Sequence, residues 1–333
     1  AGSMALFADG RAAGEVTQRG REVLSQVVDA LRQRGMALIE GDTDGVYFAV
    51  PGGWTEEQER ALVEEIASEL PAGIRLEYEG RYKAMFSHEV KNYALLTYGG
   101  QLVVRGVALR SSRAEPFGER FLRQALLCAM TNDIVGLRKV YLETVAALRN
   151  RALPASDLGA KVRLSKTTEA YMASRAGHPE PQYEALLLAG RTRWYPGERV
   201  RYYRARNKRY VWLPEEADAE MAEMETSVGS DGGAEIAEVQ EDGEEQEEVG
   251  IDREQAQGVQ GVVAVLGSSV EVANRRDYDV EHYLQVLVTS YAARLRKAFS
   301  ADDFEQLFRL DGQPGLFDRP VEDIGPRWIR CSS

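Results

Sequence analysis

A short stretch near the start of the chain has the pattern of a β-hairpin with an acidic turn. Residues 36–40 and 46–50 are apolar and rich in β-forming side chains, and Gly41-Asp42-Thr43-Asp44-Gly45 joins them. Turn-forming residues between two such runs predict a β-hairpin. Because alternate residues of a strand face the same side, the carboxylates of Asp42 and Asp44 could converge on one divalent cation. The alternative is an ordinary turn, since Asp and Gly both suit turn geometry.

The chemistry of the two carboxylates favours a hard cation. Two carboxylates held close together without a cation disfavour joint ionisation. Mg²⁺ prefers oxygen ligands and typically takes one or two carboxylates together with substrate phosphates. A magnesium site that also receives a phosphate-bearing substrate is therefore one prediction for this turn.

The hydrophobic periodicity around the hairpin predicts a mixed fold. Helical spacing occurs over residues 11–35 and 55–70, and Thr55 and Gln58 have the spacing of a capping box. Residues 74–79, 93–98 and 101–104 are strand-like, the last two joined by Gly99-Gly100. Helical patterns return at 115–150, 168–175, 182–190 and 279–298, with Asp279 as the expected N-cap of the last. The whole predicts an α+β fold: an antiparallel sheet with packed helices, followed by a mainly helical part with a small β-hairpin.

Charge is distributed unevenly along the chain. The net charge is −12, but residues 211–252 carry 16 Asp or Glu and no Lys or Arg, and the remainder has 41 basic against 37 acidic residues. Acidic, Gly-containing sequence with few large apolar groups predicts a disordered insertion at about 213–252. It is either a solvated linker, a mimic of DNA that competes for a basic groove, or a binding segment for a basic partner.

The segment 191–212 has the composition of a nucleic-acid contact. It holds eight basic residues against one acidic residue, Glu198, with six Trp or Tyr interleaved. Basic side chains neutralise phosphates and give a salt-dependent affinity. The alternative is an amphipathic hairpin that turns at Pro196-Gly197-Glu198, with its aromatics in a core and its arginines in water.

Several motifs in order resemble family B DNA polymerases. The hairpin resembles that family's Tyr-Gly-Asp-Thr-Asp-Ser motif, with Glu40 in place of Tyr and Gly45 in place of Ser. Further matches are Thr17, Gly20 and Arg21 of a Thr-x-x-Gly-Arg element, the Lys-x-Tyr element Lys91-Asn92-Tyr93, the basic-Gly pair Arg105-Gly106, and Asp277-Tyr278-Asp279 before the last helix. The chain is similar to the C-terminal part of such a polymerase, with the end of the palm at 1–114 and the thumb at 115–333, interrupted by the acidic insertion.

The resemblance implies template-directed nucleotidyl transfer from a dNTP to a primer 3′-end with two Mg²⁺ ions. It assigns the principal metal ligand to Asp44 and the supporting one to Asp42, and it puts a further acidic residue, Glu79, near the metals. The other implied roles are nucleotide contact by Thr43 and primer or DNA contact by Lys91, Tyr93, Arg105, Arg191, Arg193, Arg201 and Arg204.

The family's other metal aspartate, its fingers lysine and its exonuclease domain have no counterpart in this sequence. The resemblance therefore implies an upstream palm/fingers portion, either on a separate subunit or missing from a truncated gene model. A non-catalytic DNA-binding remnant or accessory subunit is one alternative, and an unrelated metal-dependent phosphotransferase is another.

Cysteine content and hydropathy indicate in which cellular compartment the protein resides. Cys128 and Cys331 lie far apart and have no His partners nearby, which disfavours a disulfide scaffold or zinc site and fits a reducing cytoplasm. No apolar run approaches the ~18 residues of a membrane span, and charges interrupt every stretch that could act as a signal peptide. We therefore expect no membrane association.

Overall fold

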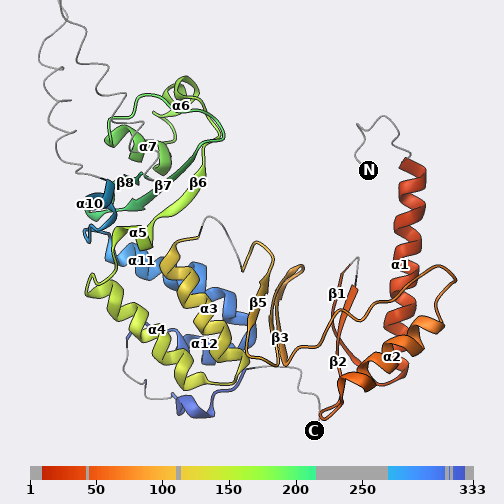
Figure 1. Ribbon diagram of the computed structural model, residues 1–333. Coiled ribbons are helices and arrows are strands. Elements are labelled where there is room, and N and C mark those ends of the chain that lie inside the picture. The colour runs from red at the N-terminus through yellow and green to blue at the C-terminus, as the bar shows by residue number, and fades with distance from the viewer. Residues whose placement is uncertain are drawn as a thin grey trace, which may run out of the picture.

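The computed structural model describes residues 10–42, 45–109, 114–214, 269–311, 315 and 318–326. Figure 1 shows three groups of elements along the molecule. The first contains α1 (Gly10–Gln33), β1 (Ala37–Asp42), β2 (Gly45–Ala49) and α2 (Glu56–Ser68). The predicted acidic insertion, at about 213–252, lies outside the described residues except for its first two positions, where Leu213 ends a strand.

The first group confirms the predicted helix, hairpin and second helix. Strands β1 and β2 pair antiparallel, with a bulge between Leu38 and Glu40 and with Asp42 opposite Gly45. The capping box of α2 is present: the Thr55 hydroxyl accepts from Gln58 N, and the Gln58 side chain accepts from Thr55 N. Leu31 of α1 and Ile66 of α2, each 1% exposed, anchor a small core beneath the hairpin.

The strand predicted at residues 74–79 is wrong. These residues form no strand and pair with none in the described part of the chain. Their side chains instead anchor the segment to α2, where the Tyr78 hydroxyl donates to Glu59 Oε2 at 2.6 Å. Arg81 Nη2 lies 3.0 Å from the other oxygen of this buried carboxylate. Alternation alone could not reveal this, because a strand also needs a neighbour to pair with.

The middle group combines a three-stranded antiparallel sheet with a helical bundle. The sheet order is β3-β4-β5, formed by β3 (Ala84–Glu89), β4 (Asn92–Leu96) and β5 (Leu102–Arg105). The hairpin predicted around Gly99-Gly100 is thus confirmed. The helices are α3 (Pro116–Met130), α4 (Ile134–Arg149), α5 (Ala155–Leu158), α10 (Ser269–Ala273), α11 (Val280–Val286), the π-helical η2 (Leu287–Tyr291), the 3-10 helix η3 (Ala292–Ala298), α12 (Ala301–Leu307) and η4 (Val321–Asp323).

One hydrophobic core joins this sheet to these helices. It contains Phe86 and Leu96 of the sheet, Phe121 of α3, Tyr141 of α4 and Leu287 of η2. The core therefore continues across residue 114, where the palm and thumb portions were expected to divide. Asp279 caps α11 as predicted, since its carboxylate accepts from His282 N at 3.2 Å.

The third group is a small sheet covered by helices. Strands β6 (Ala160–Arg163), β7 (Arg199–Arg204) and β8 (Tyr210–Leu213) form it in the order β6-β7-β8, with α6 (Thr168–Ser174) and α7 (Pro181–Leu188) alongside (Figure 1). The hairpin predicted in 191–212 turns elsewhere: the β7–β8 connection is the 3-10 turn η1 (Arg206–Lys208), not Pro196-Gly197-Glu198. Asn207 and Lys208 adopt left-handed backbone conformations there, whereas the Pro-Gly pair only leads into β7.

The predicted class, α+β with small antiparallel sheets and packed helices, is confirmed. The thumb-like part contains a three-stranded sheet where a two-stranded hairpin was expected, because β6 joins from outside the segment that suggested the hairpin. Within the described residues, no helix is long and apolar enough to cross a membrane.

Candidate functional site

The acidic hairpin lies against the turn that carries the Lys-x-Tyr element. The hydroxyls of Tyr47 on β2 and Tyr93 on β4 are 3.1 Å apart, and their ring centroids are 5.2 Å apart. Beside them, Lys91 N donates to Glu40 Oε1 at 3.3 Å. Two hairpins that are about fifty residues apart in sequence are thus joined by two contacts.

The two contacts are made from one face of the first hairpin. Glu40 and Tyr47 are cross-strand partners, so their side chains leave the same face. The backbone of Asp42 ends β1 opposite Gly45. The face that meets the Lys91 turn therefore belongs to the strand pair that carries the aspartate motif. Thr43 and Asp44 lie outside the described residues.

The Lys91 turn has an unusual backbone held by a glycine. Lys91 has a left-handed φ of 63°. Gly106, with φ of 84°, packs against it so closely that an added Cβ would lie 2.2 Å from Lys91 O and 2.4 Å from Asn92 Oδ1. The same Asn92 oxygen accepts from Ala108 N at 2.7 Å, and its amide donates to Val90 O at 2.9 Å. These contacts of Gly106 and Asn92 hold the Lys91 turn in its conformation.

Two further predicted site residues lie near this junction. Arg105, exposed on β5, is the register partner of Tyr93, so both project from one face of the sheet. Glu79 is exposed, and its charge contributes to the raised pKa of Tyr47. Burial is the main cause of that raised pKa, followed by the hydrogen bond to Tyr93, so Tyr47 keeps its proton at neutral pH.

Sequence reasoning missed Glu40, Tyr47, Asn92 and Gly106 as members of this site. Glu40 is visible in the sequence only as a departure from the family's Tyr, and its contact with Lys91 depends on tertiary structure. Its second oxygen, Oε2, is buried and has no hydrogen-bond partner in the described part of the protein. A buried carboxylate oxygen normally has a donor.

The predicted DNA-contact arginines divide into two kinds. Arg191 is largely buried, paired with Glu198 at 2.6 Å and stacked over Trp212. Arg201 Nη2 donates to Ser156 O at 2.7 Å, and Arg204 Nε lies 3.2 Å from Asp279 Oδ2. These three stabilise the fold, and Arg193 is exposed. Composition could not distinguish arginines that are paired within the fold from exposed ones, because the sequence does not show the environment of a side chain.

Histidine plays no part at the hairpin junction. His282 lies on α11 beside Arg204, and His88 lies on β3 near Lys297. Burial is the main cause of the lowered pKa of both side chains. The described residues contain no cluster of three or more His, Cys, Asp or Glu side chains with metal-binding geometry. The donor set at the acidic turn, carboxylate oxygens alone, still suits a hard cation such as Mg²⁺.

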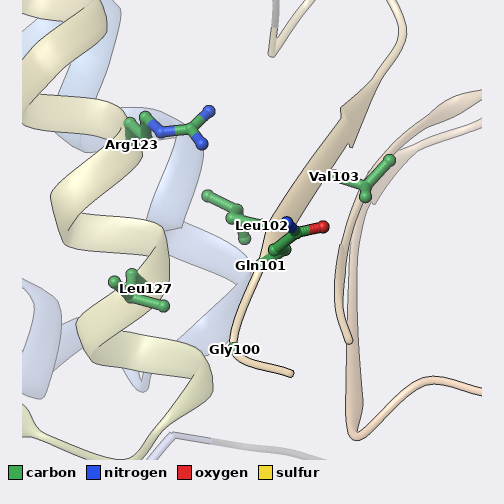
Figure 2. Close-up of a pocket in the computed structure, with 6 residues that line it drawn as sticks. All are labelled: Gly100, Gln101, Leu102, Val103, Arg123 and Leu127. Carbon is green, nitrogen blue, oxygen red and sulfur yellow. The ribbon is translucent and has the colours of Figure 1, made fainter. Parts of the chain in front are cut away.

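An open pocket of about 390 Å³ lies between β5 and α3, away from the acidic hairpin. Figure 2 shows Leu102 pointing towards α3, where Arg123 and Leu127 face it. Its lining has one cation and no carboxylate. The pocket therefore lacks the groups that a metal-dependent site needs.

Comparisons with known proteins agree with the motifs. The chain is 31% identical over 166 residues to a DNA polymerase of Pyrococcus horikoshii, which covers 48% of this chain and 13% of that protein. It is 42% identical over 100 residues to DNA polymerase 1 of Pyrococcus abyssi, covering 29% of this chain and 13% of that protein. A solved family B DNA polymerase of Pyrobaculum calidifontis aligns with a TM-score of 0.49 and 18% identity, over 70% of this chain and 31% of that one. No family model matches the chain.

The chain is thus related to archaeal DNA polymerases, and the resemblance drawn from its motifs is confirmed. It spans about an eighth of the length of the two curated relatives. That partial coverage fits a chain corresponding to one part of such a polymerase.

We expect the hairpin junction to be energetically coupled. Tyr47→Phe removes one hydroxyl of the pair and should lower the free energy of unfolding by about 1 kcal/mol, the usual net value of such a hydrogen bond. Denaturant unfolding of Tyr47→Phe, Tyr93→Phe and the double variant measures the coupling. Tyr195→Phe is the control, because Tyr195 is 72% exposed. Additive effects of the two substitutions would contradict a direct bond between the hydroxyls.

Proposed function

We propose that this chain is the metal-binding and primer-binding part of a DNA polymerase. The observation that carries the proposal is the junction at which the aspartate hairpin meets the Lys-x-Tyr turn, through Glu40–Lys91 and Tyr47–Tyr93. It brings together two motifs that the family resemblance assigns to one active site. Sequence similarity to archaeal DNA polymerases supports the same role.

Asp44 and Asp42 would hold the divalent ions, and Glu79 would be a further acidic residue near them, exposed and close enough for its charge to act on Tyr47. When bound, two Mg²⁺ ions activate the primer 3′-hydroxyl and stabilise the negative charge of the triphosphate. Thr43, between the two aspartates, is the proposed nucleotide contact.

The chain's other residues position the primer end. Lys91 and Arg105 supply positive charge for the primer backbone, and Tyr93, fixed by its contact with Tyr47, sets the position of the terminal nucleotide against the hairpin. Glu40 holds the Lys91 turn by accepting a hydrogen bond from the backbone N–H of Lys91. Backbone contacts of this kind grip a duplex without reading its sequence.

The third metal carboxylate and the fingers lysine come, in this proposal, from a preceding palm/fingers portion, on the same polypeptide or on a separate subunit. The palm would then consist of that portion together with residues 1–114, and residues 115–333 would form the thumb. The exposed first half of α1, where Val16 is 71% exposed, is the surface on which the preceding portion would pack.

The present chain alone should not extend a primer. Incubated with primer-template, Mg²⁺ and the four nucleotides, it should bind the DNA and leave the primer at its original length, because its carboxylate set is incomplete. Gel analysis of a labelled primer measures this, and a complete family B polymerase is the positive control. Robust extension that survives repurification of the chain would refute the division of the active site.

A second candidate function is a DNA-binding remnant whose aspartates no longer work. The departures from the family's motif at Glu40 and Gly45 favour it. The remnant predicts DNA binding that is indifferent to Mg²⁺, whereas a working hairpin predicts a Mg²⁺-dependent gain in affinity for a primer end with a bound nucleotide. Tight metal binding without affinity for primer-template would instead favour an unrelated phosphotransferase.

A further inference from the structure

Arg81 contacts the first group of elements and the middle group at the same time. It lies in the segment between α2 and β3. Its Nη2 donates to Trp54 O at 3.0 Å and lies 3.0 Å from Glu59 Oε1 on α2. The same nitrogen donates to the Tyr98 hydroxyl at 3.3 Å, and the guanidinium lies over the Tyr98 ring, 4.4 Å from its centroid. Because Tyr98 belongs to the turn between β4 and β5, one side chain joins α2 to that end of the sheet.

A buried carboxylate holds the arginine in this position. Glu59 is 4% exposed, its Oε2 accepts from the Tyr78 hydroxyl at 2.6 Å, and its Oε1 faces Arg81. Burial and the hydrogen bond to Glu59 raise the pKa of Tyr78, so this hydroxyl stays a donor at neutral pH. A buried charge needs a partner of opposite charge, and salt screens such a pair less than an exposed one. The Arg81 side chain is thus fixed from the α2 side.

Within the described residues, the two groups have separate hydrophobic cores. The first group packs around Leu31 and Ile66, whereas the middle group packs around Phe121 and Tyr141. Figure 1 shows one segment of chain that leads from α2 in the first group to β3 in the middle group. Relative motion of two such units is the default expectation unless a large apolar interface joins them. Their orientation therefore depends on the polar contacts between them.

These contacts lie at opposite ends of β4. Lys91 directly precedes β4 and meets Glu40 of the first group, whereas Tyr98 follows β4 and meets Arg81. A strand of five residues is about 17 Å long, so the two contact points are well separated. Contact at one point alone permits rotation about that point, and contact at both points removes this freedom.

We propose that Arg81 is a positioning residue that, through Tyr98, fixes the orientation of the aspartate hairpin against the Lys91 turn. The orientation is a property of the fold, and its consequence for nucleotide addition rests on the proposed function. Over about 17 Å, a rotation of about 4° displaces one end by about 1 Å, and a displacement of that size can lower a rate constant about a hundredfold. Arg81 acts on the reaction only through the relative placement of the two motifs.

The variant Tyr98→Ala tests the contact without leaving the carboxylate of Glu59 unpaired. Tyr98 is 59% exposed, so its loss should leave the unfolding midpoint close to the wild-type value. Arg81→Gln removes the contact from the other side. Tyr195→Ala is the matched control, because it removes another exposed tyrosine, 72% exposed, from the connection between α7 and β7.

The distance between the two groups is measured first, and this measurement needs no polymerase activity. Spin labels are attached at Ala61→Cys on α2 and Ala146→Cys on α4, two exposed positions, after Cys128→Ser and Cys331→Ser. The Tyr98→Ala variant should widen the distance distribution by at least about 1 Å, and the control should leave it unchanged. An unchanged distribution in Tyr98→Ala would overturn the proposal.

Single-turnover primer extension by the assembled polymerase is measured second. Tyr98→Ala should lower the rate constant for nucleotide addition by about tenfold to a hundredfold, while the affinity for a blunt duplex stays within about twofold of the wild-type value. A wider distance distribution with an unchanged rate constant would overturn the positioning role. If the wild-type assembly itself adds no nucleotide, the proposed function fails, and the distance measurement alone decides whether Arg81 fixes the orientation.

Discussion

Replacing Asp44 by Ala should abolish nucleotide addition by the assembled polymerase while leaving its affinity for duplex DNA nearly unchanged. If Asp44 is the principal metal ligand, as we propose, it acts on the transition state, so its loss should lower the rate constant for nucleotide addition by at least about a thousandfold, or about 4 kcal/mol. Single-turnover primer extension, with the chain joined to or mixed with the preceding palm/fingers portion, measures the rate constant.

Glu77→Ala is the matched control for that experiment. It removes an exposed carboxylate from the same group of elements without touching the motif. It should leave the rate constant within about twofold of the wild-type value. If Asp44→Ala extends primers as fast as this control, the hairpin is not a metal site and the DNA-binding remnant becomes the better account.

Replacing Gly106 by Ala should disrupt the Lys91 turn. The new Cβ would collide with Lys91 O at 2.2 Å and with Asn92 Oδ1 at 2.4 Å, at a φ of 84° that alanine rarely adopts. Overpacking and backbone strain together should lower the free energy of unfolding by about 3 kcal/mol or more. Denaturant unfolding measures that loss, and affinity for a primer end should fall with it.

Gly100→Ala provides the control for backbone strain alone. Gly100 lies in the turn between β4 and β5 of the same sheet and has a similar φ of 80°, but nothing lies within 4 Å of its added Cβ. Its cost should stay near the ~1–2 kcal/mol of a left-handed residue. If both alanine variants are destabilised equally, the close approach of Gly106 to the Lys91 turn has no special importance.

The sequence predicted the individual helices, caps and turns of this molecule better than it predicted which strands pair with one another. The capping box at Thr55, the N-cap at Asp279 and the hairpin around Gly99-Gly100 depend on a few neighbouring residues, and all are present. Residues 74–79 alternate like a strand but are used to reach Glu59 on α2. Pro196-Gly197 does form the predicted turn, but that turn leads into β7, which pairs with β6 and β8 rather than with a strand just before the turn. Long-range pairing decides such cases, and local pattern does not encode it.

The candidate site shows the same division. Its motif residues could be identified because their order along the chain resembles a known family. The residues that join the motifs could not, because Glu40 and Tyr47 gain their roles only when the two hairpins meet. Likewise, the arginines of 191–212 differ in environment rather than in identity: Arg191 is enclosed with Glu198, while Arg199 is exposed.

Reconstitution of primer extension tests the central claim most directly. The chain would be combined with a polypeptide carrying the preceding palm strand, with its metal aspartate, and the fingers lysine of a family B polymerase. The account predicts templated, Mg²⁺-dependent extension by the mixture and by neither component alone. A stable mixed complex that binds primer-template and adds no nucleotide would contradict it.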